Sequence, residues 1–481
     1  MSTMLFPSSI VRWIVPVWTI AASLFAGTVM AQSPVTLTIG RASGENPIPP
    51  DFIGLSFETE ALKRGDRGGN GYMFDSTNRQ LITLFQNLGI KSLRIGGTSV
   101  DHNELGYIPA TTDLDALFRF AGCAQVKVIY SLRLFNGDPL QDTSAAKYVL
   151  QNYARYLTCL AIGNEPNLYK GKDADITNDS SFCNKWRTFA SIITNSVPHA
   201  KFGGPDTGTG GTSWASDFAK QEANSGILTY LFAHYYVGGN PKGDALALIN
   251  RMLSPAWDTF NYPAYYDKIG VPARSLGIPY RLTELNSFVA NYPGIWGGNN
   301  AYATALFSLD CLHWWAAHHC AGVNLHTVVG KYNGTICRDS KGDYQVYPIA
   351  YGIKAFDVGG HGQVDPVSVT NPDRLNLTAY AVTGTDHDLY VTAINKEHTT
   401  AARNAMVTIE PGGLSFSTVQ AMFLVQANGD AGATNGITLG GASIENNAPW
   451  TGKWTRLKPG KNGCVVIVPA ASAAIVRFSY R

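Results

Sequence analysis

The feature that most constrains the fold is an alternation of short apolar runs with amphipathic helical patterns, which begins near residue 50. The eight expected strands lie at 52–57, 92–95, 126–132, 158–162, 201–204, 230–235, 280–283 and 322–326. Helical patterns separate them, for example at 76–88, 145–157, 182–193 and 302–317. Strands that alternate with helices form a parallel sheet, and eight such units predict an α/β fold, a closed (β/α)8 TIM barrel over residues 50–352.

A different pattern follows over residues 353–481. Strand-like runs at 377–382, 388–395, 405–409, 417–425, 464–469 and 474–478 stand between turns rich in Gly, Asn and Asp. This spacing predicts a C-terminal antiparallel β-sandwich. Before the barrel, segment 32–49 contains an alternating polar and apolar run, and we expect it to supply a strand that joins the sandwich.

Residues 1–31 have the features of a signal peptide. Arg12 supplies the positive charge, 13–29 is mostly apolar, and Ala31 ends a small-residue cleavage site. A retained membrane anchor is the alternative, but Pro16 and the polar Gln32 favour cleavage. We therefore expect a secreted or periplasmic protein without a membrane partner after cleavage.

Composition excludes several classes of function. Among 481 residues, 45% are hydrophobic and 15% charged, so the chain has material for large cores and is not intrinsically disordered. A formal net charge of +2 gives no support for a nucleic-acid partner. No Cys/His cluster has zinc spacing, and Gly208–Gly211 lacks the spacing of a phosphate-binding loop, so no metal or cofactor is predicted.

Export would permit disulfides among the seven cysteines, whose odd number leaves at least one without an intramolecular partner. Cys311 and Cys320 lie on one expected helix, roughly 13 Å apart, which is too far for a bridge. Cys320 with Cys337 is the favoured pair, and buried free thiols are the alternative.

Two glutamates stand at the ends of expected barrel strands. Glu165 lies in the tetrad Gly-Asn-Glu-Pro that closes the fourth strand, and Glu284 ends the seventh. A buried carboxylate is costly unless it is paired or used, and barrel active sites lie at the C-terminal ends of the strands. Glycoside hydrolysis requires two such acids, a proton donor and a nucleophile or base. A structural ion pair or a solvated loop is the alternative for either one.

Other polar side chains follow the same strand ends. They are Glu58, Glu60, Asp101, His102, Asn103, Asn164, His234, Tyr235, Tyr236, Asn286, His326 and Tyr332. We expect Asn164 to hydrogen-bond a sugar hydroxyl beside the scissile bond. We expect Tyr235 to hydrogen-bond Glu284 and hold it as the nucleophile.

The motifs together resemble those of the clan A retaining glycosidases, and more specifically glycoside hydrolase family 79, which contains β-glucuronidases and heparanases. The matching segments are FIGLSFE at 52–58, LRIGGT at 93–98, AIGNEPN at 161–167 and TELNS at 283–287. The resemblance implies that Glu165 is the acid/base and Glu284 the nucleophile.

The same resemblance assigns substrate contacts. Glu58, Asp101 and Asn164 would bind sugar hydroxyls, while Tyr292, Gly294 and Tyr332 would hold a uronate carboxylate. No arginine occurs in the loop that contains Tyr292 and Gly294, so the uronate assignment depends on the resemblance.

The leading hypothesis is a retaining exo-β-glucuronidase that acts on glucuronic-acid-containing glycans or glycosides without a cofactor. A heparanase-like endo-β-glucuronidase would need a basic cleft, whereas Lys170, Lys172 and Lys331 are scattered. A β-glycosidase for a neutral sugar and a secreted carbohydrate-binding protein on an inactive scaffold are the remaining alternatives.

Overall fold

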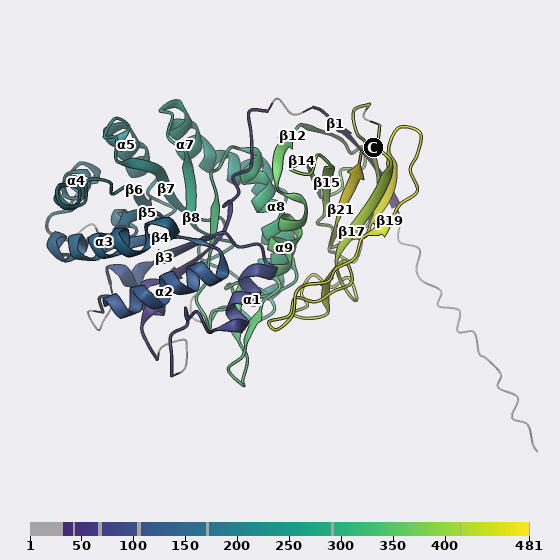
Figure 1. Cartoon of the computed structure of the whole chain (residues 1–481). Coiled ribbons are helices and arrows are strands. Elements are labelled where there is room, and N and C mark those ends of the chain that lie inside the picture. Colours follow the sequence, from purple (N-terminus) through teal and green to yellow (C-terminus); the bar gives the residue numbers. More distant parts are fainter. Residues whose placement is uncertain are drawn as a thin grey trace, which may run out of the picture.

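A computed structural model describes residues 32–41, 44–65, 70–102, 107–169, 173–289, 293–413 and 415–480. The expected signal peptide, 1–31, lies outside the described residues. Figure 1 shows a barrel and a β-sandwich side by side, with helices α8 and α9 between them. The predicted combination of a (β/α)8 barrel with a C-terminal antiparallel sandwich is confirmed.

The barrel is closed by eight parallel strands, which hydrogen-bond in sequence order until the last meets the first. They are β2 (Ile53–Glu58), β3 (Ser92–Gly96), β4 (Lys127–Leu132), β5 (Leu157–Ile162), β6 (Phe202–Thr207), β7 (Leu228–Tyr236), β8 (Tyr280–Asn286) and β9 (Val323–His326). Nearly every residue of these strands is buried, because side chains on one face fill the barrel and those on the other contact helices. A small hairpin, β10 (Ile336–Arg338) and β11 (Tyr344–Val346), follows β9.

Helices surround the barrel. They are α1 (Arg79–Asn87), α2 (Thr111–Ala124), α3 (Pro139–Tyr153), α4 (Asp179–Ser196), α5 (Thr212–Glu222), α6 (Ala245–Met252), α7 (Tyr262–Ser275), α8 (Ala303–Ala317) and α9 (Ile349–Gly359). Their beginnings are fixed by capping: Asn78 accepts from the N–H of Leu81, and Asn178 from that of Ser181. Helix α9 follows β9 and crosses the expected domain boundary at residue 352. In the described part of the chain, no helix is long and apolar enough to cross a membrane.

The sandwich consists of two sheets. The larger has the order β12-β14-β15-β21-β17-β18, with β19 also paired to β17, and the smaller has the order β13-β1-β16-β20. Their bounds are β1 (Gln32–Ile39), β12 (Gly362–Asp365), β13 (Val367–Thr370), β14 (Leu377–Gly384), β15 (Leu389–Asn395), β16 (Asn404–Glu410), β17 (Thr418–Gln426), β18 (Ile437–Leu439), β19 (Thr455–Arg456), β20 (Cys464–Val468) and β21 (Ser472–Ser479).

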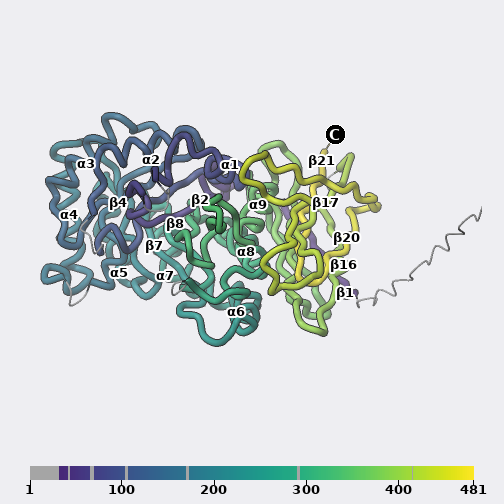
Figure 2. Tube along the Cα trace, turned by 90° about the horizontal axis from the view of Figure 1, so that it is seen from below, coloured from purple at the N-terminus to yellow at the C-terminus, as the bar shows by residue number. Residues whose placement is uncertain are grey.

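Strand β1 precedes the barrel in sequence but lies in the smaller sheet of the sandwich (Figure 2). It pairs antiparallel with β13 and parallel with β16, so this sheet is not wholly antiparallel. Val35, Leu37 and Ile39 point into the sandwich core and are at most 3% exposed, which explains the alternating pattern of this segment.

Helix α8 is buried on nearly all sides because the barrel covers one face and α9 and the sandwich cover the other. Its carboxylate Asp310 accepts hydrogen bonds from Lys396, at 2.8 Å, and from Tyr380 of the sandwich, at 2.7 Å. Lys396 also pairs with Asp258 of the barrel. Burial and the nearby charge of Asp310 raise the pKa of Asp258 to about 8. A charged cluster therefore joins the two domains inside an apolar interface.

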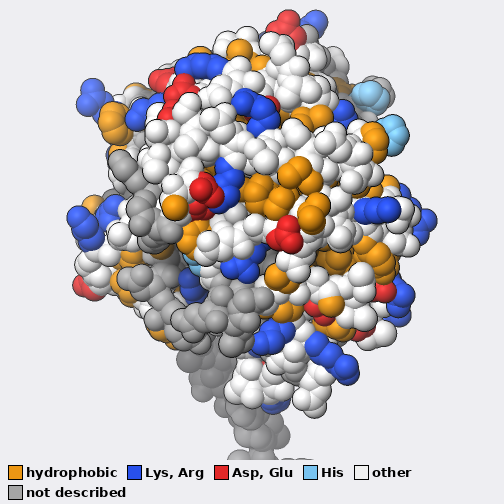
Figure 3. Space-filling view, turned by 90° about the vertical axis from the view of Figure 1, so that its left-hand side faces the viewer, with side chains coloured by type: hydrophobic (Ala, Val, Ile, Leu, Met, Phe, Trp, Pro, Cys, Tyr) orange, Lys and Arg blue, Asp and Glu red, His pale blue; other side chains and the backbone are white. Residues whose placement is uncertain are grey.

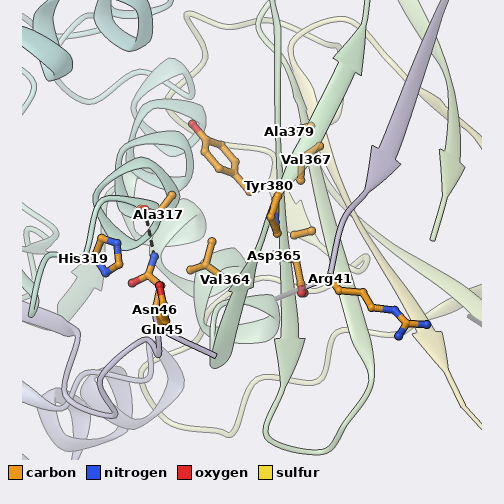
Figure 4. Close-up of a pocket in the computed structure, with 12 residues that line it drawn as sticks. Arg41, Glu45, Asn46, Ala317, His319, Val364, Asp365, Val367, Ala379 and Tyr380 are labelled. Carbon is orange, nitrogen blue, oxygen red and sulfur yellow. Dashed lines mark hydrogen bonds between the residues drawn. The ribbon is translucent and has the colours of Figure 1, made fainter. Parts of the chain in front are cut away.

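The chain between β1 and β2 is anchored at the opposite end of the barrel from the C-terminal ends of its strands. Asn46 Nδ2 donates to the carbonyl oxygens of Ala316 and Ala317, at 3.1 Å each, and so caps the C-terminus of α8. Figure 4 shows this contact beside a groove of about 420 Å³ between barrel and sandwich.

All seven cysteines are free, so the expected Cys320–Cys337 bridge is wrong. The Cys320 thiol is buried and contacts the carbonyl oxygen of Gly322 at 3.2 Å, while Cys337 lies on β10. Most of the thiols are buried, and burial raises the pKa of Cys320 to about 11, which leaves it a weak nucleophile.

We predict that Lys396→Met lowers the free energy of unfolding by about 3–5 kcal/mol, because it leaves the Asp310 carboxylate buried without its cation and removes the ammonium group that also contacts Asp258. Urea unfolding measures the loss. Lys220→Met is the matched control, since its exposed pair with Asp217 is worth less than about 1 kcal/mol. Equal losses in the two variants would contradict a role for the cluster in joining the domains.

Candidate active site

A cavity of about 360 Å³ opens at the C-terminal ends of the barrel strands. This volume lies within the range of small-molecule sites, roughly 300–1,000 Å³. The cavity is lined by Glu58, Thr98, Glu165, Asn167, Leu168, Gly208, Thr209, Gly210, Tyr236, Glu284, Val289, His326, Lys331 and Asn333. Three carboxylates therefore share one small space, and both strand-end glutamates are among them.

The turn after β5 directs Glu165 into this cavity. Glu165 has φ +49°, a left-handed conformation that non-glycine residues adopt rarely. Its N–H donates to the carbonyl oxygen of Asp206 at 2.8 Å, and Pro166 begins a short 3-10 turn immediately afterwards. Gly208 lies against the carboxylate, where an added Cβ would stand 2.9 Å from Oε1. The backbone thus holds the acid in one place.

Glu284 lies across the cavity at the end of β8. A carboxylate oxygen of Glu165, a carboxylate oxygen of Glu284 and a ring nitrogen of His234 all lie within 4.8 Å of one another, so the two carboxylates are close neighbours. Arg94 Nη1 donates to Glu284 Oε1 at 2.6 Å, and the Tyr236 hydroxyl donates to Oε2 at 3.0 Å. Burial raises the pKa of Glu284, but the charges of His326, His234 and Arg94 outweigh it and hold the pKa well below its ordinary value. Glu284 is therefore ionised at neutral pH.

Arg94, on β3, lies beneath the cavity and is fully buried. Besides Glu284, its guanidinium donates to Asn164 Oδ1 at 2.7 Å and to Asp206 Oδ2 at 3.1 Å. Burial lowers the pKa of Arg94, but the charges of Asp206 and Glu284 outweigh it and raise the pKa further. The sequence prediction assigned Arg94 no role, although a charged residue inside a buried strand is itself a signal.

His234, on β7, lies between Glu165 and Glu284, and its Nδ1 is 3.8 Å from Glu284 Oε2. Its Nδ1 lies 3.1 Å from Glu165 Oε1, and its Nε2 lies 3.2 Å from Asp206 Oδ1. Burial lowers the pKa of His234, but the charge of Glu284 and the hydrogen bonds with Asp206 and Glu165 raise it to about 9. Burial raises the pKa of Asp206, and Arg94 and His234 bring it below its ordinary value.

The cluster of Glu165, His234 and Glu284 has donor atoms close enough to hold a metal ion. Metal coordination requires a neutral imidazole, so an ion would have to displace the proton that the raised pKa favours on His234. Arg94 also occupies one oxygen of Glu284. The cluster is therefore better suited to hydrogen bonding and proton transfer than to metal binding.

Tyr236, and not Tyr235, contacts Glu284, so the sequence prediction is wrong by one residue. Side chains alternate along a strand, and His234 and Tyr236 face the barrel interior. Tyr235 faces the surrounding helices: its ring stacks on Tyr265 with centroids 4.0 Å apart, and its hydroxyl donates to the carbonyl oxygen of Asn261 at 2.9 Å.

Of the three residues expected to bind sugar hydroxyls, Glu58 lines the cavity. It accepts from the N–H of Ser99 at 2.8 Å and lies 3.5 Å from His326 Nε2. Burial raises the pKa of Glu58, but the hydrogen bond and charge of His326 outweigh it and lower the pKa below its ordinary value. A carboxylate in this state can accept hydrogen bonds from hydroxyl groups.

Asp101 and Asn164 lie behind the cavity wall. Asp101 is 1% exposed and accepts from the backbone N–H groups of Leu134 at 2.8 Å, Phe135 at 2.9 Å and Asn164 at 2.8 Å. Burial raises the pKa of Asp101 to about 7 against these donors. Asp101 thus holds together the loops after β3, β4 and β5. The side-chain oxygen of Asn164 accepts from Arg94.

None of the three residues expected to hold a uronate carboxylate is among the described residues that line the cavity. Tyr292 lies outside the described residues. Gly294, at φ +106°, and Tyr332 lie beside the cavity but are not among its lining residues. The N–H of Tyr332 donates to the carbonyl oxygen of Pro293 at 2.7 Å, and its ring meets Trp296 edge-on at 5.1 Å. These contacts join the loops after β8 and β9.

The fold is shared with glycoside hydrolases of known structure. A 4-O-α-L-rhamnosyl-β-D-glucuronidase from Fusarium oxysporum 12S matches with a TM-score of 0.69 and 16% identity, over 92% of this chain and 99% of that one. A GH51 arabinofuranosidase from Xanthomonas axonopodis pv. citri has a TM-score of 0.68 and 14% identity, over 93% and 100%. A GH39 enzyme from the same bacterium has a TM-score of 0.61 and 13% identity, over 95% and 99%. No protein-family model and no curated protein sequence matches the chain.

We predict that His234 remains doubly protonated at pH 7, because its pKa is raised to about 9, and loses its proton only as the pH rises through that value. ¹⁵N NMR of the imidazole rings measures this, with Gln substitutions to assign the signals. His313 is the internal control, since burial lowers its pKa to about 3 and keeps it neutral. A neutral His234 ring at pH 7 would contradict the described charge arrangement.

Proposed function

We propose that the protein is an exported retaining exo-β-glucuronidase, which removes terminal β-linked glucuronic acid, with or without a 4-O-methyl group, from glycans or glycosides. The observation that carries the reaction class is the placement of Glu165 and Glu284, with an oxygen of each within 4.8 Å of the other at the mouth of the barrel. Retaining glycosidases hold their two carboxyl groups about 5 Å apart, whereas inverting enzymes separate them by roughly 6.5–9.5 Å to admit a water.

In the first step, Glu284 attacks the anomeric carbon while Glu165 donates a proton to the leaving oxygen. Arg94 and Tyr236 hold one oxygen of Glu284 each, which fixes the direction of attack. In the second step, Glu165 removes a proton from water, which attacks the anomeric carbon and releases Glu284. His234 hydrogen-bonds Glu165 throughout and keeps the carboxyl group oriented.

Two observations support a uronic acid as the sugar. The four segments of resemblance to family 79 contain both glutamates and Glu58. The structurally similar rhamnosyl-glucuronidase is named for action at a β-glucuronide. The similar arabinofuranosidases favour a neutral pentose as the second candidate. Exo action is preferred over cleavage within a sulfated chain, because Lys331 is the one Lys or Arg among the described residues that line the cavity. Figure 3 shows basic and acidic side chains interspersed on the side of the barrel that it draws.

Hydrolysis of p-nitrophenyl β-D-glucuronide, beside the matching glucoside and xyloside, tests the proposal. We predict selective cleavage of the glucuronide and loss of turnover in Glu284→Gln, whose side chain is too weak a nucleophile to attack. Urea unfolding of the variant checks that its fold is intact. Preferential cleavage of a neutral sugar would overturn the substrate assignment, and full activity in Glu284→Gln would overturn the mechanism.

We predict that Tyr236→Phe lowers kcat about 10- to 100-fold, because it removes a hydrogen bond to the ionised Glu284. Tyr235→Phe is the matched control: it removes the neighbouring hydroxyl, which contacts only the carbonyl of Asn261 among the described residues, and should keep kcat within about threefold. Steady-state kinetics on the preferred substrate distinguishes the two. A larger loss in Tyr235→Phe would contradict the described orientation of β7.

A further inference from the structure

Lys331 lies in the loop after β9 and is, among the described residues that line the active-site cavity, the one Lys or Arg. A turn fixes its backbone, because its N–H donates to the carbonyl oxygen of Val328 at 2.9 Å and its carbonyl oxygen accepts from Gly334 at 3.1 Å. The neighbouring residue, Tyr332, is held by Pro293. The position of the lysine on the cavity wall is therefore set by the fold.

The Lys331 side chain is half-buried and forms no ion pair with a described residue. Among the described residues, three other buried or half-buried lysines are paired, Lys185 with Asp173, Lys354 with Asp357 and Lys396 with Asp310, each at 2.8 Å. Half-buried Lys63 has no described ion pair, but it does not line the cavity. An anion bound in the cavity would give the Lys331 ammonium group the counter-ion that no described side chain supplies.

A second argument comes from the charges of the cavity itself. Glu58 and Glu284 both have lowered pKa values and are ionised at neutral pH, so the cavity repels a negatively charged sugar. The charge of Arg94 is already shared by Glu284 and Asp206 beneath the wall. A substrate carboxylate therefore needs another cation, and Lys331 lines the same space.

We propose that Lys331 Nζ forms an ion pair with the carboxylate of the bound uronic acid and thereby selects anionic over neutral sugars. This inference rests on the proposed function and identifies a specificity residue for it. The neutral donors implied by the family resemblance, near Gly294 and Tyr332, would orient the carboxylate, and Lys331 would supply the charge. Glucuronic acid differs from xylose by the carboxylate alone, so the two sugars separate these effects.

The test compares kcat/KM for p-nitrophenyl β-D-glucuronide and β-D-xyloside in the wild type, Lys331→Met, Lys331→Arg and Lys341→Met. We predict that Lys331→Met lowers the glucuronide-to-xyloside ratio about 10- to 100-fold, mainly through KM. Lys331→Arg keeps most of the ratio, because it keeps the charge. Lys341→Met is the matched control, since Lys341 is exposed on the β10–β11 turn and does not line the cavity. Added NaCl should raise the glucuronide KM of the wild type more than that of Lys331→Met.

An unchanged ratio in Lys331→Met, or equal losses on both substrates, would overturn the role of Lys331 while leaving glucuronidase activity in place. Failure of the wild type to prefer the glucuronide would instead overturn the proposed function. In that case, calorimetry of free glucuronate and xylose with Glu284→Gln decides the inference. If Glu284→Gln binds glucuronate and the double variant Glu284→Gln/Lys331→Met does not, the ion pair is upheld. If Glu284→Gln does not bind glucuronate, the ion pair is overturned.

Discussion

The buried guanidinium of Arg94 is the constraint on which the rest of the barrel mouth depends. A charge that is fully removed from water is tolerable only when several partners surround it. Arg94, on β3, finds them in Asn164 after β5, Asp206 on β6 and Glu284 on β8. Four strands must therefore close in the correct register to stabilise one cation. The same contacts place and ionise Glu284, so the geometry of the site and the closure of the barrel are not separable.

Around Arg94 and Glu284, acidic and basic side chains alternate across the barrel mouth. Glu165 and Asp206 contact opposite nitrogens of His234, while His326 lies between Glu284 and Glu58. Four carboxylates can thus occupy a small volume without strong mutual repulsion, because a basic side chain lies between neighbours. This arrangement also leaves the cavity with little positive charge for a ligand. A sugar acid must find its counter-ion on the wall, where Lys331 lies.

The sequence predicted the barrel well because hydrophobic periodicity reports burial, and the strands are buried on both faces. Helix ends were less accessible, since α4 begins at the cap formed by Asn178 and not where its apolar pattern begins. Tyr235 and Tyr236 could not be told apart, because the run from Leu231 to Tyr236 is apolar or aromatic apart from His234 and shows no alternation. Each strand-end glutamate could be identified from the sequence around it alone. The network through Arg94 and His234 could not, because it forms only between strands that are distant in sequence.

The position of β1 has a consequence for synthesis. This strand leaves the ribosome before the barrel, yet its neighbours in the sheet are residues 367–370 and 404–410. The barrel can therefore assemble before the partners of β1 are synthesised, and the face of α9 and α8 that packs on the larger sheet stays exposed to solvent until that sheet is made. That face becomes fully buried only after β21, near residue 479, has been synthesised. A product truncated within the sandwich would keep both an unpaired strand edge and an apolar surface, the two features by which chaperones and proteases recognise an unfinished protein.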